Sequence, residues 1–215
     1  MDIVIPSATN LGLFISAALL LLVVPGPAVL YIFARSVGQG RAAGIVSILG
    51  IHTATLVHVT AATVGLSAIL ASSALAFAII KYAGAAYLIW LGLKKIFGRA
   101  EPLDAGTITK VSHARVFRDG FIVNLLNPKT ALFFLAFLPQ FVEVERGHVG
   151  MQIAFLGLLF TLLGFVTDSC YALAAGTIGN RLKSSPGFLK AEGYVTGAIF
   201  IGLGLSAALG SSQKK

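Results

Sequence analysis

The feature that most constrains this chain is a series of apolar segments, each long enough to cross a lipid bilayer. A helix needs about 20 residues to span a hydrocarbon core of about 30 Å. Six segments reach that length: 11–34, 42–70, 74–96, 121–141, 150–176 and 188–209. With 57% hydrophobic and 11% charged residues, the chain has too few polar side chains to cover a soluble globule of 215 residues. The sequence therefore predicts an all-α membrane protein with a single transmembrane domain.

Two of these six segments need a closer look. The first is interpreted as a span and not as a signal peptide, because no basic residue precedes it and its apolar run continues through Ile32. The sixth is the weakest, because Lys190 and Glu192 lie near its start. An arrangement with five spans therefore stays open.

Basic residues are distributed unevenly between the two sides that six spans would create. Eleven lie in the loops after the first, third and fifth segments (Arg35, Arg41, Lys94, Lys95, Arg99, Lys110, Arg115, Arg118, Arg181, Lys183 and Lys190), and four lie on the other side (Lys81, Arg146, Lys214 and Lys215). Cytoplasmic loops of membrane proteins carry the excess of Lys and Arg, so we expect these three loops to be cytoplasmic and both termini to face outward. The same placement explains the net charge of +8 without nucleic-acid binding.

Prolines interrupt two of the apolar segments at comparable positions. Pro25, Gly26 and Pro27 lie in the first segment, and Pro128 lies in the fourth. A proline inside a helix removes a backbone N–H and clashes with the preceding turn. One interrupted helix in each half of the chain indicates a binding site near the bilayer midplane of a transporter with internal repeats.

Three spans in each half would make the second half insert upside down. We therefore expect two inverted three-helix repeats, at about 7–97 and 117–210, joined by a cytoplasmic loop at about 98–116. That loop is too short to fold as a separate catalytic or nucleotide-binding domain, and the chain lacks common hydrolase, metalloprotease and phosphate-binding motifs. An enzyme is not expected, and neither a cofactor nor a metal site is predicted.

Two charged residues lie inside apolar segments, where charges are expensive. Asp168 is the only acid in the interior of a span, and it is interpreted as a proton-coupling site, as a contact for a substrate ammonium, or as the ion-pair partner of Lys129. Lys129 follows Pro128 and could pair with a carboxylate or reach the membrane interface along its aliphatic stem. The sequence leaves these alternatives open.

Polar residues accompany the second interruption and the second segment. Asn124 and Asn127 are three residues apart on one helix face, so their amides can bind either a ligand or neighbouring helices. Helices that restart after Pro27 and Pro128 present backbone N–H groups that favour an anion, such as a carboxylate. His52 and His58 are six residues apart and about 120° apart around a helix, so they do not converge on one metal. Each is interpreted as a packing histidine or a proton-handling group.

The interrupted segments and their flanks resemble a known family. The matching residues are Pro25-Gly-Pro27 with Tyr31, Gly38-x-Gly40-x-x-x-Gly44 and Leu49-Gly50; Gly84-Ala-x-Tyr87-Leu-x-x-Leu91-Gly; and Phe117-Arg-x-Gly120-Phe-x-x-Asn124-Leu-x-Asn127-Pro-Lys129 with Phe133-Phe134 and Pro139-Gln-Phe141. This pattern resembles the LysE/RhtB amino-acid exporter superfamily over nearly the whole chain. It departs at His52, and a His52 that faces the cavity would imply a substrate unlike the usual ones.

The resemblance implies a secondary exporter in the bacterial inner membrane, with both termini periplasmic. Its substrate would be threonine, homoserine, lysine or a related compound such as a homoserine lactone, and its driving force the proton gradient or the membrane potential. A channel-like pore, or an exporter of another small metabolite, is the alternative. Glycines spaced by four, Gly40 with Gly44 and Gly193 with Gly197, allow close helix packing within one chain or in a homodimer.

Overall fold

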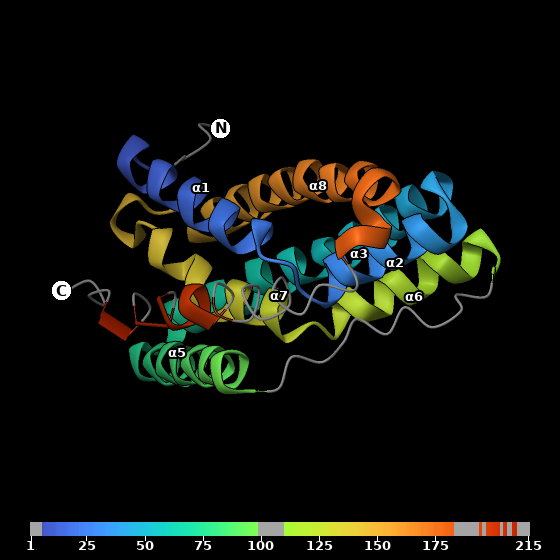
Figure 1. Cartoon of the computed structure of the whole chain (residues 1–215). Helices are drawn as coiled ribbons and strands as arrows, with labels where there is room; N and C mark the ends of the chain where they lie inside the picture. Colours follow the sequence, from blue (N-terminus) through green and yellow to red (C-terminus); the bar gives the residue numbers. More distant parts are fainter. Residues whose placement is uncertain are drawn as a thin grey trace.

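A computed structural model of the chain describes residues 6–98, 110–182, 194, 197–202, 204–205 and 208–209 (Figure 1). Within these residues the secondary structure is helical throughout, as predicted. The elements are α1 (Ala8–Val23), α2 (Pro27–Gln39), α3 (Arg41–Ala61), the π-helical turn η1 (Ala62–Leu66), α4 (Ser67–Ser72), α5 (Ala74–Phe97), α6 (His113–Leu125), α7 (Pro128–Leu132), the π-helical turn η2 (Phe133–Phe137), the 3₁₀ turns η3 (Leu138–Phe141) and η4 (Val144–Arg146), and α8 (Val149–Leu182).

Helices of membrane-spanning length and hydropathy are present. Two continuous helical stretches qualify, Arg41–Ile69 and Val149–Ala175, and two bent pairs of helices qualify when each pair is counted as one span, which gives up to four among the described residues. The predicted third span coincides with the 24 residues of α5. Most of the predicted sixth span lies outside the described residues. The arrangement as six spans in two inverted repeats therefore remains a prediction.

Both predicted interruptions are confirmed. α1 ends at Val23, and α2 begins at Pro27 with a bend of 51° between the two helices. α6 ends at Leu125, and the next helix begins at Pro128 with a bend of 46°. In each case the proline takes the first position of the new helix, where its missing N–H costs no hydrogen bond and its fixed φ suits a helix start.

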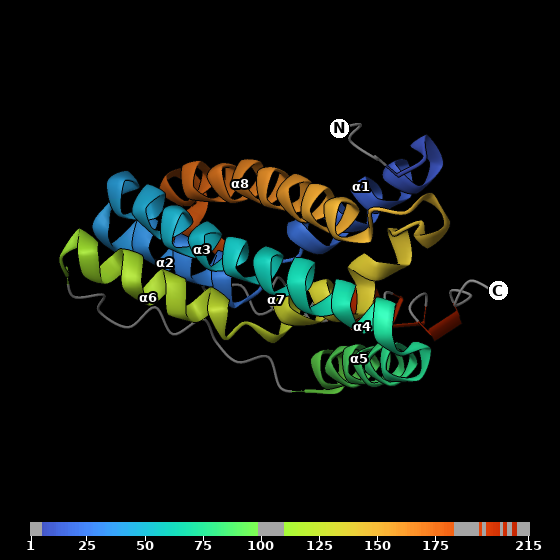
Figure 2. The same cartoon turned by 180° about the vertical axis from the view of Figure 1, so that it is seen from behind.

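α3 forms the centre of the bundle. It packs against α2, α6 and α8, and most extensively against α6 (Figure 2). The close approach of α3 and α6 depends on Gly50, because a Cβ atom there would lie 2.2 Å from the backbone oxygen of Phe117. Gly40 links α2 to α3 with φ of +93°, a conformation that L side chains rarely adopt, so it serves the turn and not helix packing.

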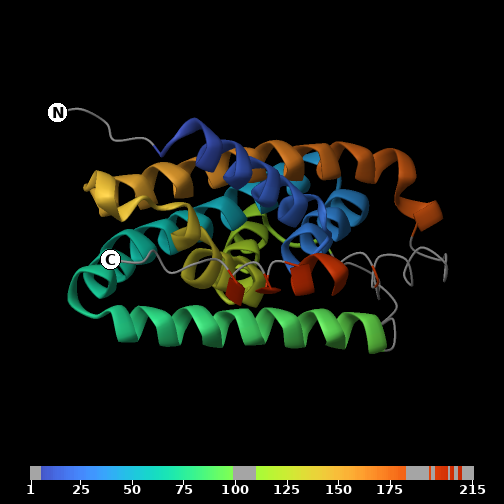
Figure 3. The same ribbon diagram turned by 90° about the vertical axis from the view of Figure 1, so that its left-hand side faces the viewer.

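α5 lies along one side of the bundle, as Figure 3 shows. A Cβ atom on its Gly84 would lie 2.3 Å from the Cβ of Ala136 in η2, so this glycine permits close packing. A Cβ on Gly197 would lie 2.6 Å from the backbone oxygen of Gly92 in α5. Of the predicted close-packing glycines, Gly44 and Gly197 therefore make their contacts within the chain, and Gly193 lies outside the described residues.

At one end of the bundle, the start of α1 is joined to the segment that follows η3. Glu143 accepts hydrogen bonds from the Ser7 hydroxyl at 2.5 Å and from the Asn10 amide at 2.7 Å. Arg146 pairs with the same carboxylate at 3.2 Å. Gln152 of α8 hydrogen-bonds both the backbone N–H and the backbone oxygen of Glu143 at 2.9 Å. Glu143 thus connects three parts of the chain.

At the opposite end, α2 is joined to α6. The Tyr31 hydroxyl donates to the backbone oxygen of Val116 at 2.9 Å, and Arg35 lies 3.8 Å from the Asp119 carboxylate. Arg115 and Arg118 also pair with Asp119, at 3.7 and 3.1 Å. The two broken helices therefore contact each other at both ends of the bundle (Figure 1). At one end α1 contacts η3, and at the other end α2 contacts α6.

Candidate functional site

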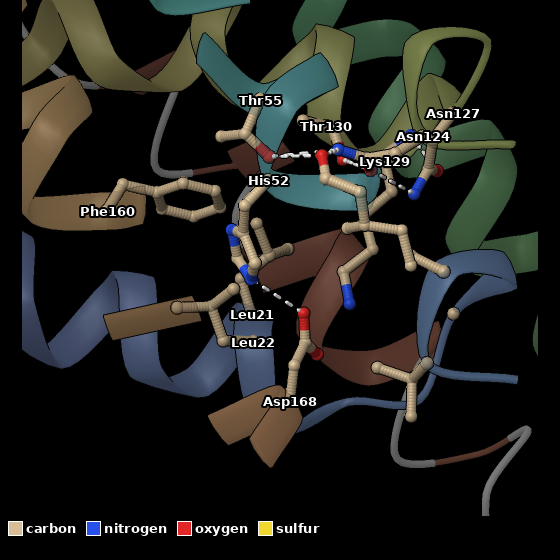
Figure 4. A pocket seen from close by; sticks show the side chains of 14 residues that line it. Leu21, Leu22, His52, Thr55, Asn124, Asn127, Lys129, Thr130, Phe160 and Asp168 are labelled. Carbon is tan, nitrogen blue, oxygen red and sulfur yellow. Dashed lines mark hydrogen bonds and ion pairs between the residues drawn. The ribbon is translucent and has the colours of Figure 1, made fainter. Parts of the chain in front are cut away.

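A small pocket lined by polar and apolar residues in equal number lies where the two interrupted helices meet. Both breaks contribute to its wall, and α3 and α8 complete it (Figure 4). The lining residues are Leu21, Leu22, Gly26, Ala28, Val29, Ile51, His52, Thr55, Asn124, Asn127, Lys129, Thr130, Phe160 and Asp168. The cavity measures about 40 Å³. One water needs roughly 10–15 Å³, so the space holds only a few waters.

The first break leaves backbone carbonyls at the end of α1 without helical partners. Val23 would accept from residue 27 and lacks that bond because Pro27 has no N–H. The Tyr171 hydroxyl of α8 donates to Val23 O at 2.5 Å, and the Lys129 ammonium donates to Val24 O at 2.6 Å. The end of α1 is thus satisfied by side chains from two other elements. Lys129 itself is 9% exposed, so it is buried within the protein.

The second break is satisfied by its own side chains. Asn127 caps the new helix by accepting from the Lys129 backbone N–H at 3.1 Å. Asn124 accepts from the Thr130 hydroxyl at 2.9 Å and donates across the interface to Ile51 O and to Thr55 Oγ1 of α3, each at 2.9 Å. The shared face predicted for the two asparagines is present, since Asn127 Nδ2 lies 3.4 Å from Asn124 Oδ1.

The start of α2 differs from the start of α7, although both begin with proline. Its N-cap residue is Gly26, which offers no side chain, and no side-chain cap satisfies the first N–H groups of α2. Ala28 and Val29, which carry those groups, line the pocket. Uncapped N–H groups at the positive end of a helix attract an anion. Of the two predicted restarts, only the one after Pro27 lacks a side-chain cap on its first N–H groups.

Asp168 is paired with His52. The carboxylate oxygen Oδ2 lies 3.1 Å from His52 Nε2, and both residues are almost completely buried in the pocket wall. Sequence spacing could not reveal this pair, because the two residues are 116 positions apart and lie on α8 and α3. The second ring nitrogen, His52 Nδ1, is buried and has no hydrogen-bond partner within the described residues.

His58 belongs to a different environment. Its Nε2 lies 3.3 Å from Asn124 O, and its ring stacks on Phe134 with 6.0 Å between the ring centroids. It does not line the pocket, and it does not meet His52, in agreement with the predicted angle between them. Of the singled-out residues, Gly26, His52, Asn124, Asn127, Lys129 and Asp168 line the pocket, while Pro25, Pro27 and Pro128 shape the breaks beside it. Thr55 and Thr130 also line the pocket, and Tyr171 contacts the first break beside it. No motif pointed to these three residues.

Comparison with known proteins agrees with the resemblance in the sequence. The family model described as LysE type translocator matches residues 19–211, which include every residue of the pocket. The chain belongs to the LysE type translocator family.

Several curated relatives of this LysE type translocator align over nearly their whole length. It is 32% identical to the homoserine/homoserine lactone efflux protein of Salmonella typhimurium strain LT2, over 89% of this chain and 92% of the relative. It is 31% identical to an uncharacterized membrane protein of Vibrio cholerae serotype O1, over 91% and 94%. It is 26% identical to the leucine efflux protein of Salmonella choleraesuis, over 90% and 92%. No solved structure matches the translocator significantly.

Proposed function

We propose that this LysE type translocator exports an amino acid or a close derivative, such as threonine, homoserine, lysine or leucine, across the bacterial inner membrane as a secondary active carrier. The observation that carries the proposal is a pocket between two broken helices that contains buried polar and charged side chains, since carriers built from internal repeats bind substrates between such helices near the bilayer midplane. Relatives named as efflux proteins for homoserine and leucine support the same substrate class.

The pocket chemistry matches the two charged ends of an amino acid. The substrate carboxylate binds the uncapped N–H groups at the start of α2, next to Gly26. The substrate ammonium approaches Asp168 and competes with His52 for the carboxylate. A pocket with both an anion site and a buried acid suits a zwitterion better than a purely anionic or purely apolar ligand.

The energy source is the proton gradient or the membrane potential. A membrane potential is worth about 2.3 kcal/mol per elementary charge per 100 mV, which is enough to drive roughly 50-fold accumulation when one charge moves per transport cycle. Asp168 is the coupling residue in this proposal, because it is the acid inside the pocket and its partner His52 can also carry a proton.

The two halves move as inverted repeats, and the contacts between the broken helices support this. α1 contacts η3, and α2 contacts α6, so each half of one broken helix faces the opposite half of the other. Arg35, Arg115 and Arg118 gather at one end, which we assign to the cytoplasm, with both termini periplasmic. The two helix breaks and the buried charges of Lys129 and Asp168 favour a carrier over a channel-like pore, which would conduct without saturation.

Counterflow of labelled homoserine, leucine and lysine in proteoliposomes tests the proposal. Wild-type protein should accumulate at least one of these against unlabelled internal substrate and respond to an imposed pH gradient. Asp168→Asn should abolish the response to the gradient, whereas Asp119→Asn, at the end of the bundle, should keep it. Unchanged proton dependence in Asp168→Asn would remove the coupling role, and failure to move any amino acid would remove the substrate class.

A further inference from the structure

The Lys129 ammonium occupies an unusual position for a lysine in a carrier pocket. Its Nζ lies 2.6 Å from Val24 O, at the C-cap of α1. That end of α1 carries the negative end of the helix dipole, and the break that follows it removes helical donors through Pro25 and Pro27. In carriers with discontinuous helices, such C-terminal ends and unwound carbonyls hold mobile cations such as Na⁺. Here the position is taken by a side chain of the other half.

The chain is built to bring Lys129 to this position. The Asn127 side chain caps the Lys129 backbone N–H and so holds the residue at the start of its helix. Gly26 leaves room for the lysine stem, because a Cβ atom there would lie 3.2 Å from Lys129 Cδ. The neighbouring carbonyl, Val23 O, receives the neutral hydroxyl of Tyr171. The C-terminal end of α1 is thus bound by one charged donor, the Lys129 ammonium, and one neutral donor, the Tyr171 hydroxyl.

We propose that the ammonium of Lys129 is the resident cation of a carbonyl site at the end of α1, and that it replaces the mobile Na⁺ ion that such a site would otherwise take. Lys129 is then a positioning residue that joins the two breaks, and it is not a receptor for the substrate. The consequence for transport rests on the function proposed above: export should need no sodium. The cation site itself is a property of the folded protein and can be tested without transport.

Thermal unfolding of the detergent-solubilised protein tests the site directly, in NaCl, in methylammonium chloride and in choline chloride at equal ionic strength. Lys129→Ala removes the ammonium and opens space, so Na⁺ or methylammonium should bind the vacated carbonyls and raise the Tm by several degrees over choline. Wild type and Lys129→Arg should show no difference among the three salts. Tyr171→Phe is the matched control, because it removes the other donor without removing a charge.

The outcomes separate this inference from the proposed function. A Tm of Lys129→Ala that is the same in all three salts overturns the cation site, as does failure of this variant to fold in any of them. Recovery of a folded Lys129→Ala only in NaCl or methylammonium chloride supports it. Counterflow by wild type that requires Na⁺ also overturns the cation site. Absence of counterflow in every salt contradicts the proposed function, and the unfolding data alone then test the cation site.

Discussion

Asn124 is the side chain whose removal should weaken the contact between α3 and the second broken helix most. It is 2% exposed, and its amide makes three hydrogen bonds of 2.9 Å, to Ile51 O and Thr55 Oγ1 on α3 and from Thr130 Oγ1 on α7. Asn124→Ala removes all three bonds at a buried place. Thr130 Oγ1 loses its acceptor, whereas Thr55 Oγ1 and Ile51 O keep the 3.2 Å bond between them.

The expected loss follows from the number of bonds. Hydrogen bonds between transmembrane helices contribute about 0.6 kcal/mol each on average and up to about 1.7 kcal/mol. Three such bonds give a decrease of about 2 kcal/mol in the free energy of unfolding, with roughly 5 kcal/mol as the upper bound. Equilibrium unfolding by SDS in mixed micelles measures this difference, with helix content followed by circular dichroism.

A matched control is available on α3. Thr60 is exposed, and its hydroxyl bonds to Leu56 O within the same helix, so Thr60→Ala should change the free energy of unfolding by less than about 0.5 kcal/mol. An Asn124→Ala variant as stable as the Thr60→Ala variant would refute the assignment of Asn124 as the main polar contact between these helices.

Further predictions concern the ends of the bundle and its close contacts. The hydrogen bond from the Ser7 hydroxyl lowers the pKa of Glu143 below its ordinary value of 4.5. The ionised carboxylate therefore stabilises the fold above pH 4.5, and this stabilisation is lost as the pH falls through the lowered pKa. Thermal unfolding measured against pH should show this loss of stability in wild type and a smaller loss in Glu143→Gln. Gly50→Ala should separate α3 from α6 and sharply lower the yield of folded protein on size-exclusion chromatography, whereas Gly65→Ala, with nothing within 4 Å of the added Cβ, should fold normally. Gly40→Ala should cost about 1 kcal/mol in unfolding experiments, because φ there is +93°, and an unchanged stability would contradict the turn geometry.

Local chemistry made part of this architecture predictable. Proline has no N–H wherever it occurs, so Pro27 and Pro128 marked both breaks without knowledge of the fold. An acid in the interior of an apolar span must face protein or a cavity, so Asp168 could be assigned to the interior, where it lines the pocket. The structure at such positions is determined by residues that are close by in the sequence, so it can be predicted without the fold. For Lys129 the sequence left the interface open, and its burial in the same pocket was not predictable.

Partners across the bundle were not predictable. His52 and Asp168 meet because α3 packs against α8, and nothing in the spacing of the two residues encodes that packing. The same holds for Tyr171, because its hydroxyl can donate to Val23 O only when the end of α1 lies against α8. The difference between the capped start of α7 and the uncapped start of α2 depends on a single residue, Asn127 against Gly26, in front of each proline.

The contacts at the two ends of the bundle depend on different solution variables. Around Asp119 the contact is ionic, and its partners Arg115 and Arg118 are largely exposed, so dissolved electrolyte weakens it. Around Glu143 the contact combines short hydrogen bonds to the carboxylate, which acid removes, with an ion pair to the half-exposed Arg146, which electrolyte weakens. Added salt should therefore weaken the Asp119 end of the bundle more than the Glu143 end, where hydrogen bonds to the carboxylate remain.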